Sequence, residues 1–277
     1  MSVEPSQSAA SSARTITSDA PFFVCLIVLG GAYVLLILAM LVADASFTTP
    51  DHLWSALKSP EIRYSIKLSL ISCALTTILS LWVAVPIGYL MSRFDFRGRS
   101  VVDSVLDIPV VLPPLVIGLS LLILFQTPVG RAVERVVPVT YEIPSVILAQ
   151  FTVACAFAVR TMRVTFDQIP IRAEQVALTL GCTRSQAFWM VVLPEARRGM
   201  LTAATLAWAR SLGEFGPILV FSGATRMRTE VMPTTVFLEL SIGNLEAAVA
   251  VSLLMVVAAV VVLVNARIFG LRRPPML

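Results

Sequence analysis

The stretch LSLISCALTTILSLWVAVPIGYLMS, residues 68–92, contains no charged side chain and lies between Lys67 and Arg93. A helix crosses the hydrocarbon core of a bilayer with about 20 predominantly apolar residues. Only helices and closed barrels satisfy their backbone hydrogen bonds in hydrocarbon, and this run is continuous rather than alternating. It therefore predicts a transmembrane helix.

Five more runs of this kind predict an all-α integral membrane protein with six transmembrane helices. The expected spans are about 22–43, 68–92, 108–130, 143–159, 199–222 and 247–266. The composition agrees, because 57% of the 277 residues are hydrophobic and only 14% are charged, against about 45–50% and about 25% in soluble domains. The first run is longer than the ~7–15-residue apolar core of a signal peptide, so we expect an uncleaved helix. The Ser- and Ala-rich residues 1–20 are expected to form a mobile tail before the transmembrane domain 21–277.

The distribution of Lys and Arg predicts the orientation of these helices. If both termini are cytoplasmic, the inner segments carry thirteen of these residues and the outer segments seven, with one more inside a span. Positive charge is enriched on the cytoplasmic side of membrane proteins, so we expect cytoplasmic N and C termini. The net charge of +4 is then loop charge, and no nucleic-acid partner is expected. The outer segment 51–67 mixes apolar and charged residues, which predicts either an interfacial helix or an ordered loop.

The longest inner segment, residues 160–198, is too apolar for a plain linker. Glu174–Leu180 predicts a short helix, with a carboxylate in its first turn that suits the helix dipole. Gly181 follows it and provides the left-handed residue with which such helices often end.

A second short helix is predicted directly afterwards. Thr183 and Gln186 match a capping box, in which each side chain satisfies a free backbone amide of the helix start. We expect this helix to end at Leu193 and Pro194, because proline disfavours helix at the residue before it. The two helices together would present a bulky aromatic pair on the cytoplasmic side.

These residues resemble the EAA loop of ABC importer permeases. That pattern is a Glu, a small-residue pair, a Gly, nine further residues, and then an apolar residue, any residue, Leu and Pro. The stretch EQVALTLGCTRSQAFWMVVLP supplies it with Glu174, Val176, Ala177, Gly181, Val191, Leu193 and Pro194. Val176 departs from the pattern, since the family usually has Ala there, and its larger side chain could alter helix packing. The resemblance extends from about Ser55 to Ala266.

In that family the loop docks in a cleft of a separate ATPase subunit. The resemblance implies ATPase-coupling roles for Glu174, Ala177, Gly181, Phe188, Trp189, Leu193 and Pro194, with the two aromatic side chains as the groups that enter the cleft. Two alternatives stay open: Phe188 and Trp189 as membrane-interface aromatics, and Glu174 as a favourable charge at a helix start. The chain has no G-x-x-x-x-G-K-[ST] motif, so ATP is expected to be bound and hydrolysed by a partner.

The predicted fifth span contains two charges within AWARSLGEFGP. Arg210 and Glu214 lie four residues apart and hence on one helix face. Charges at this depth normally face the bundle interior, a partner or a water-filled path. Gly213, Gly216 and Pro217 permit close helix approach and loosen the helical hydrogen bonds. Two interpretations are equally open: a translocation path or gate lined by Arg210, Gly213, Glu214 and Gly216, and a structural ion pair.

Other residue types narrow the range of functions. The single histidine, His52, and four scattered cysteines show no metal-ligand spacing, so no metal, cofactor or catalytic residue is expected. Pro109, Pro113 and Pro114 in the third run predict a kink, which either lines a pore or serves packing.

The fifth-span stretch ARSLGEFG is similar to a signature of permeases for molybdate, tungstate and sulfate, and residues 229–255 are similar to the same subgroup. Phe215 favours molybdate or tungstate, because the sulfate branch more often has Tyr there. The resemblance implies an inner-membrane homodimer that works by alternating access, with an ABC ATPase dimer and an extracytoplasmic oxyanion-binding protein as partners.

Three alternatives remain at this point. The nearest is an ABC permease for sulfate, thiosulfate, phosphate or another solute. The second is a stand-alone channel or secondary carrier, which would have no need of the loop at 174–194. The third is a membrane-embedded enzyme, which would need a nucleophile and a base within the spans; the only His is external, and no Asp or Glu cluster has metal-ligand spacing.

Overall fold

The computed structural model describes residues 20–271, which contain helices and no strand. They divide into two units, the first ending at Ser46. Helix α1 (Ala20–Phe47) makes up the first unit, and its segment Phe22–Phe47 is long and apolar enough to cross a membrane. The mobile tail expected over residues 1–20 lies outside the described residues, except that Ala20 begins α1.

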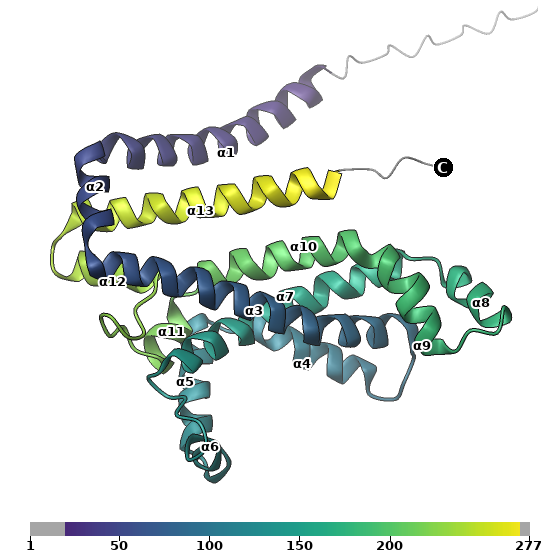
Figure 1. Cartoon of the computed structure of the whole chain (residues 1–277). Coiled ribbons are helices and arrows are strands. Elements are labelled where there is room, and N and C mark those ends of the chain that lie inside the picture. Colours follow the sequence, from purple (N-terminus) through teal and green to yellow (C-terminus); the bar gives the residue numbers. More distant parts are fainter. Residues whose placement is uncertain (1–19, 272–277) are drawn as a thin grey trace, which may run out of the picture. The chain divides into compact units, whose positions relative to one another are not determined.

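The second unit is a helical bundle (Figure 1). Its elements are α2 (Pro50–Lys58), α3 (Pro60–Arg93), α4 (Arg99–Val111), α5 (Pro114–Gln126), α6 (Pro128–Glu134), α7 (Ile143–Gln168), α8 (Ile171–Thr179), α9 (Arg184–Ala187), a π-helical segment (Phe188–Val192), α10 (Leu193–Leu212), α11 (Gly216–Phe221), α12 (Met232–Ser241) and α13 (Leu245–Leu271). Figure 1 shows α8 and α9 at one end of this bundle and α2, α11 and α12 at the other. We call these the α8 end and the α12 end.

Helices α3, α7 and α10 form the centre of the bundle. Small side chains from all three are fully buried where the helices meet, namely Ala84, Ala154, Ala158, Ala203 and Ala207. At Gly88 the approach is closer still, because a Cβ atom there would lie 2.8 Å from the Cβ of Met162. Lipid tails are as apolar as the helices, so close packing of small residues, rather than apolar burial, holds such helices together.

A line of small hydroxyl residues runs along one face of α3. Its members are Ser65, Ser69, Ser72, Thr76 and Ser80, and each is at most 1% exposed. The Ser69 hydroxyl accepts a hydrogen bond from the Met232 N–H at 2.8 Å, and Thr76 donates to the Gln150 side chain at 3.2 Å. Small polar residues of this kind link membrane helices by hydrogen bonds as well as by close packing.

The third predicted span, 108–130, is not one straight helix. It covers the end of α4, all of α5 and the start of α6, and α4 meets α5 at a bend of 112°. Pro113 and Pro114 cause the break: neither has an N–H to donate, and Pro114 forces extended backbone at Pro113 (ψ 134°). Pro109, by contrast, lies within α4 without ending it.

The fifth predicted span, 199–222, is also interrupted. Helix α10 begins earlier than expected, at Leu193, and ends at Leu212, and the six-residue α11 follows after Gly213–Phe215. Pro217 cannot donate a hydrogen bond to the carbonyl one turn before it, which favours a break here.

Four helices of the described part of the chain are long and apolar enough to cross a membrane. They are Phe22–Phe47, Pro60–Arg93, Ile143–Gln168 and Leu245–Ile268, and the bent pair α4–α5 makes a fifth if it is counted as one span. The helices therefore account for the first, second, fourth and sixth predicted spans directly. Six crossings and the sidedness of the termini stay predictions.

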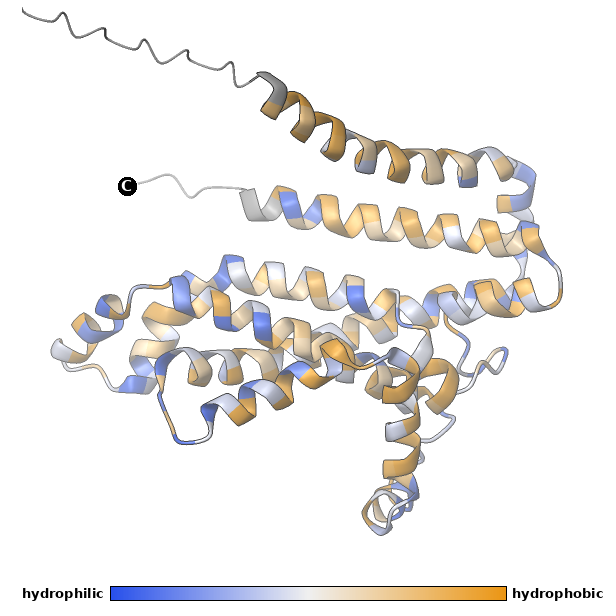
Figure 2. Ribbon diagram, turned by 180° about the vertical axis from the view of Figure 1, so that it is seen from behind, coloured by the Kyte–Doolittle hydropathy of each residue, from blue (hydrophilic) through white to orange (hydrophobic). Residues whose placement is uncertain are grey.

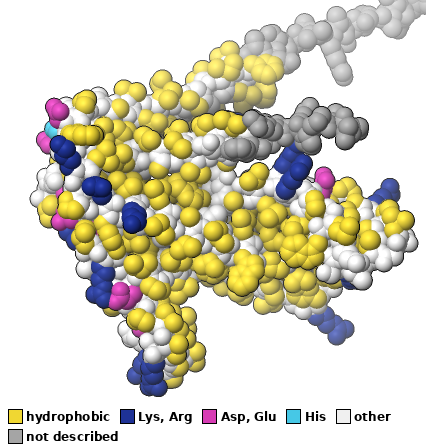
Figure 3. Space-filling model, viewed as in Figure 1, with side chains coloured by type: hydrophobic (Ala, Val, Ile, Leu, Met, Phe, Trp, Pro, Cys, Tyr) yellow, Lys and Arg dark blue, Asp and Glu magenta, His cyan; other side chains and the backbone are white. Residues whose placement is uncertain are grey.

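The surface of the long helices is largely apolar. Exposed side chains include Leu70, Ile71, Ile78 and Trp82 on α3, and α13 exposes a row of valines. Figure 2 shows hydrophobic residues along the full length of the helices, and Figure 3 shows most of the visible Lys and Arg side chains toward the two ends of the bundle. This distribution suits helices whose middle parts face lipid.

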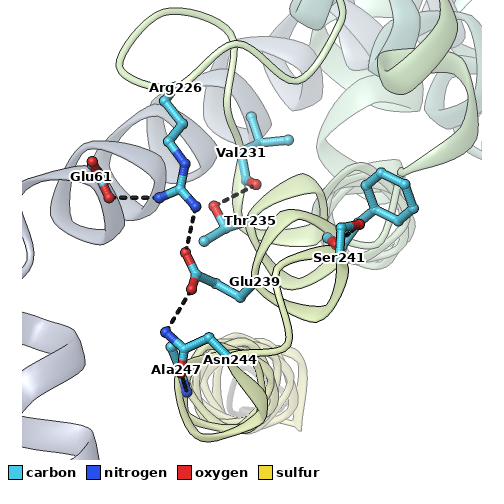
Figure 4. A network of polar contacts seen from close by, with 9 residues as sticks. Glu61, Arg226, Val231, Thr235, Glu239, Ser241, Asn244 and Ala247 are labelled. Carbon is cyan, nitrogen blue, oxygen red and sulfur yellow. Dashed lines mark hydrogen bonds and ion pairs between the residues drawn. The ribbon is translucent and has the colours of Figure 1, made fainter.

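An ion-pair network joins three elements at the α12 end (Figure 4). Arg226 donates to Glu61 of α3 at 2.6 Å and to Glu239 of α12 at 2.8 Å. Asn244, which precedes α13, donates to the second oxygen of Glu239 at 2.8 Å. Helix α2 packs nearby as a true helix, capped by Thr49, so the helical interpretation of the segment after residue 50 is confirmed. The network fixes the loop between α11 and α12 to the bundle.

Glu230 beside this network supports a prediction about pH. It is fully buried, and this burial raises the pKa of its carboxyl, although Thr235 and Arg226 offset the rise in part. A raised native pKa means that ionisation of Glu230 costs stability once the pH exceeds the unfolded value of about 4.3. We expect Glu230→Gln to match the wild type in thermal stability near pH 4.5 and to exceed it increasingly as the pH rises to about 8.

The control is Glu239→Gln, which weakens the ion pair with Arg226 and should lower stability at neutral pH. Melting of the detergent-solubilised protein across this pH range measures both variants. A Glu230→Gln variant that is less stable than the wild type at pH 8 would show that the carboxylate is ionised and usefully paired.

Candidate functional site

The segment between α7 and α10 folds as two short helical pieces, in agreement with the sequence pattern. Helix α8 ends in a Schellman arrangement, with the Gly181 N–H bonded to Leu178 at 3.0 Å and the Cys182 N–H bonded to Ala177 at 3.1 Å. Gly181 adopts the left-handed conformation at φ +91°. The predicted helix stop at Gly181 is therefore confirmed.

The second piece begins as predicted but does not end as predicted. Thr183 and Gln186 form the expected capping box. The helix then passes through the π-helical segment, in which the Leu193 N–H bonds to the Phe188 carbonyl, and continues into α10 without a break. Pro194 falls in the first turn after this widened segment, where its missing N–H is tolerated. The prediction that Leu193 and Pro194 end the helix is wrong.

Glu174 anchors α8 to the bundle. One of its carboxylate oxygens accepts a hydrogen bond from the Tyr89 hydroxyl at 2.7 Å, and the other lies 3.5 Å from the Arg93 guanidinium. Arg93 also donates to the Ile169 carbonyl at 2.9 Å. Ala177, one turn further on, is buried on the same side of α8. Glu174 and Ala177 thus face inward, toward the end of α3.

The two aromatic residues of the segment point in different directions. Phe188 packs inward, with its ring 4.7 Å from that of Tyr89 and 6.5 Å from that of Phe166. Trp189 is 61% exposed. Sequence reasoning treated the two as equivalent, whereas in the structure Phe188 is partly buried against the bundle and Trp189 is the more exposed of the two.

Other apolar side chains of the segment are exposed together with Trp189. They are Val176, Leu180 and Met190. The sequence contained a signal for them, because Glu174 and Ala177 mark the inward face of α8 and the remaining apolar positions must then lie elsewhere on the helix. A short element that is anchored on one side and apolar on the other is suited to docking.

The charged pair joins the last turn of α10 to the break that follows it. Arg210 and Glu214 lie 2.5 Å apart, and their side chains are 29% and 1% exposed. The Arg210 guanidinium also lies 5.8 Å from the centre of the Phe157 ring on α7. The carboxylate is thus enclosed, whereas the arginine retains access to the surface beside α7.

The two broken helices meet next to this pair. A Cβ atom on Gly216 would lie 2.9 Å from Pro114, and one on Gly118 would lie 2.8 Å from Pro217. The break between α4 and α5 therefore packs against the break between α10 and α11. Gly213, in contrast, has open space around it, with no contact closer than 3.8 Å. Backbone that leaves the helical form at membrane depth is tolerated where it is buried in protein or lines a cavity.

Sequence reasoning missed Gln150, which lies fully buried in α7. Its amide donates to the Ser211 carbonyl at 3.3 Å, at the last turn of α10, and accepts from Thr76 of α3. The residue therefore holds three helices together just before the second break. A lone amide in an otherwise apolar run was the available signal, because such residues in membrane helices are rarely idle.

Within residues 20–271, no three His, Cys, Asp or Glu side chains gather in a group that could hold a metal ion. The four cysteines are free thiols.

Comparison with known proteins identifies the family to which the chain belongs. Residues 84–273 match the family described as the binding-protein-dependent transport system inner membrane component. The chain belongs to this family. It is accordingly a multi-pass protein of the inner membrane, in keeping with its long apolar helices.

Several relatives are named as transport system permeases for sulfate, molybdenum, or molybdate and tungstate. The sulfate transport system permease protein CysT of Salmonella typhimurium is 30% identical over 87% of this chain and 86% of its own length. The molybdenum transport system permease protein ModB of Mycobacterium tuberculosis is 32% identical over 93% and 96% of the two chains. The molybdate/tungstate permease protein WtpB of Pyrococcus abyssi is 32% identical over 58% and 61%.

A solved permease shares the fold. A chain of a bacterial alginate ABC transporter, crystallised in complex with a periplasmic protein that holds an alginate pentasaccharide, superposes with a TM-score of 0.74. The superposition covers 92% of this chain and 95% of the other at 16% identity. At this identity the likeness concerns the fold alone.

The anchor of α8 can be tested through Tyr89→Phe, which removes the hydroxyl that bonds to Glu174. A hydrogen bond to a charged group contributes about 1.5–3 kcal/mol, so we expect amide hydrogen exchange in residues 171–180 to become about tenfold faster. Mass spectrometry of exchange in detergent measures this. Tyr64→Phe is the matched control, because its hydroxyl bonds to the Arg228 carbonyl at the α12 end. Unchanged exchange in Tyr89→Phe, or the same acceleration in both variants, would argue against the anchor.

Proposed function

We propose that this chain is the permease subunit of an ABC importer and that it carries molybdate or tungstate across the inner membrane as a homodimer. In this proposal the chain crosses the membrane six times with both termini cytoplasmic. The α8 end lies in the cytoplasm and docks on a dimer of ATPase subunits. The α12 end receives the oxyanion from an extracytoplasmic binding protein.

The observation that carries the proposal is the anchored segment at the α8 end. It has the spacing of the EAA loop, it is held to α3 through Glu174, and it exposes Trp189 and its apolar neighbours. The chain itself contains no P-loop motif. ATP is therefore bound and hydrolysed by another chain, and this subunit makes and breaks no covalent bond.

The continuous helix after this segment gives a physical route for coupling. Helix α10 extends 20 residues from Leu193, about 30 Å at 1.5 Å per residue, and ends beside Arg210 and Glu214. A displacement of α9 and Trp189 is passed along α10 as along a rod, since α9, the π-helical segment and α10 follow one another without a break. The soft point is Gly213–Phe215, where the movement would open or close the path.

Arg210, Gly213, Glu214 and Gly216 are placed at this gate. Arg210 lies in the last turn of α10 and Glu214 in the break that follows it, so the pair joins the end of the helix to the break, where a movement of α10 would act on it; this favours the gate over a purely structural pair. Enclosed Glu214 offsets the charge of Arg210 and limits how strongly an anion is held there. A moderate attraction for the anion suits a transport path, because the anion must also leave it.

The relatives support an oxyanion as cargo, and Phe215 in the GEFG stretch supports molybdate or tungstate. Relatives named for sulfate and for molybdenum match at similar identity, so sulfate or thiosulfate is the second candidate.

The deciding experiment is uptake of labelled molybdate, tungstate and sulfate into proteoliposomes. The chain is reconstituted with the ATPase and the binding protein encoded beside it. We expect ATP-dependent uptake of molybdate or tungstate, with sulfate a poor competitor. Uptake of sulfate alone would overturn the choice of cargo, uptake of all three without ATP would favour a stand-alone carrier, and an assembled complex without any oxyanion uptake would overturn the substrate class.

Coupling can be tested at Gly181, which has open space around its Cβ position but a left-handed backbone. Gly181→Val places a β-branched residue in that conformation, at a cost of about 1–2 kcal/mol or more. We expect the spans to insert normally while the amount of ATPase that co-purifies with the tagged permease falls several-fold. Gly181→Asn is the control, because asparagine tolerates this conformation. Normal ATPase recovery and transport in Gly181→Val would exclude the proposed role of the segment.

A further inference from the structure

A hollow with a mixed polar and apolar lining lies between α7 and α10 at the α8 end, away from the proposed gate. Its volume is about 690 Å³. Two arginines, Arg160 and Arg198, line it together with Gln168 and the hydroxyl residues Thr161, Thr165 and Thr202. None of these residues belongs to the stretch 174–194 that resembles the EAA loop or to the proposed gate.

The charge of the hollow favours an anion. Two guanidinium groups face one carboxylate, that of Glu195. Arg160 is 63% exposed and has only a long contact of 3.9 Å with Asp107, so most of its N–H donors remain available. The neighbouring Arg163 forms a close ion pair with Asp103 and does not line the hollow.

The hollow and the proposed gate lie along the same two helices, α7 and α10. On α7, Phe157, Arg160 and Val164 recur every three to four residues and so lie on one face. On α10, a stripe of the same periodicity leads from Arg198 through Thr202 toward Gly213, fifteen residues and about 22 Å away. Arg210, which lies beside this stripe, contacts the Phe157 ring of α7 at 5.8 Å.

We infer that this hollow is a binding site for a tetrahedral oxyanion on the cytoplasmic side of the gate, where the transported ion rests before release. The inference rests on the proposed function and adds the site and its ligands. Arginine suits this role because its planar fork donates two parallel hydrogen bonds to an oxyanion. The three threonine hydroxyls now donate to carbonyls one turn earlier in their own helices, and rotation about one bond turns each toward the anion.

Direct binding tests the site without any transport step. The purified complex of permease and ATPase, without binding protein, is titrated with molybdate at constant ionic strength set by chloride, and its melting temperature is followed. Ligand that binds only the folded protein raises this temperature. We expect saturable stabilisation in the wild type and a half-saturating concentration at least tenfold higher in Arg160→Gln and in Arg198→Gln.

Arg197→Gln is the matched control, because it removes the same charge one residue from Arg198 but does not line the hollow. It should titrate like the wild type. Arg160→Lys keeps the charge without the fork and should bind with intermediate strength. Equal titrations in the wild type and in both hollow variants, or an equal loss in Arg197→Gln, would overturn the site.

Transport provides the second readout. Proteoliposomes loaded with molybdate should take up less labelled molybdate, and Arg160→Gln should need about tenfold more internal molybdate for the same inhibition. Absence of ATP-driven uptake in the wild type would overturn the proposed function, whereas normal uptake with unchanged inhibition in Arg160→Gln would overturn only this inference. If phosphatidylglycerol rather than molybdate stabilises the wild type and not Arg160→Gln, the hollow holds a lipid phosphate and the inference is overturned.

Discussion

The absence of water from the hydrocarbon core governs this structure, because every backbone group at that depth must find a partner within the protein. Two of the predicted spans are nevertheless broken, α4–α5 at the paired prolines and α10–α11 at Gly213–Phe215. The breaks can persist because each covers the other, through the contacts of Gly216 with Pro114 and of Gly118 with Pro217. An added methyl group at either glycine would push the two breaks apart. In the proposed mechanism, a movement of α10 would therefore act at this one place.

Small polar side chains stabilise the helices around this point. The serine and threonine line of α3 packs closely enough to be fully buried, and Gln150 ties it to the final turn of α10. Each of these hydrogen bonds is modest, because the separated helices in a membrane also find partners for such groups. They matter because of where they lie. Gln150 donates to the carbonyl of Ser211, directly before α10 ends.

The sequence predicted those parts of the fold that depend on local chemistry. Uncharged runs marked the long helices, and Gly181 with the capping box marked the turn between α8 and α9, because a positive φ and a free amide each demand particular residues. The helix through Pro194 was mispredicted, since the widened π-helical turn that accommodates the proline has no local signature. The different directions of Phe188 and Trp189 were not predicted either, because Phe188 packs on Tyr89, almost a hundred residues earlier in the chain. The packing of Pro114 against Gly216 is likewise a contact between distant segments.

The arrangement of charge along α7 and α10 fits the requirements of an anion path. At the proposed gate, Arg210 is compensated by Glu214, so a doubly charged ion would meet only a weak attraction although electrostatic forces are strong away from water. At the hollow, Arg160 is barely compensated, but its exposed side chain faces water and salt, which screen its attraction. The less compensated arginine, Arg160, thus lies where water and salt screen its charge. Arg210, whose charge Glu214 offsets, lies where screening is weaker. An anion moving from one to the other would nowhere be held too tightly to leave, which is the condition for turnover in any transport path.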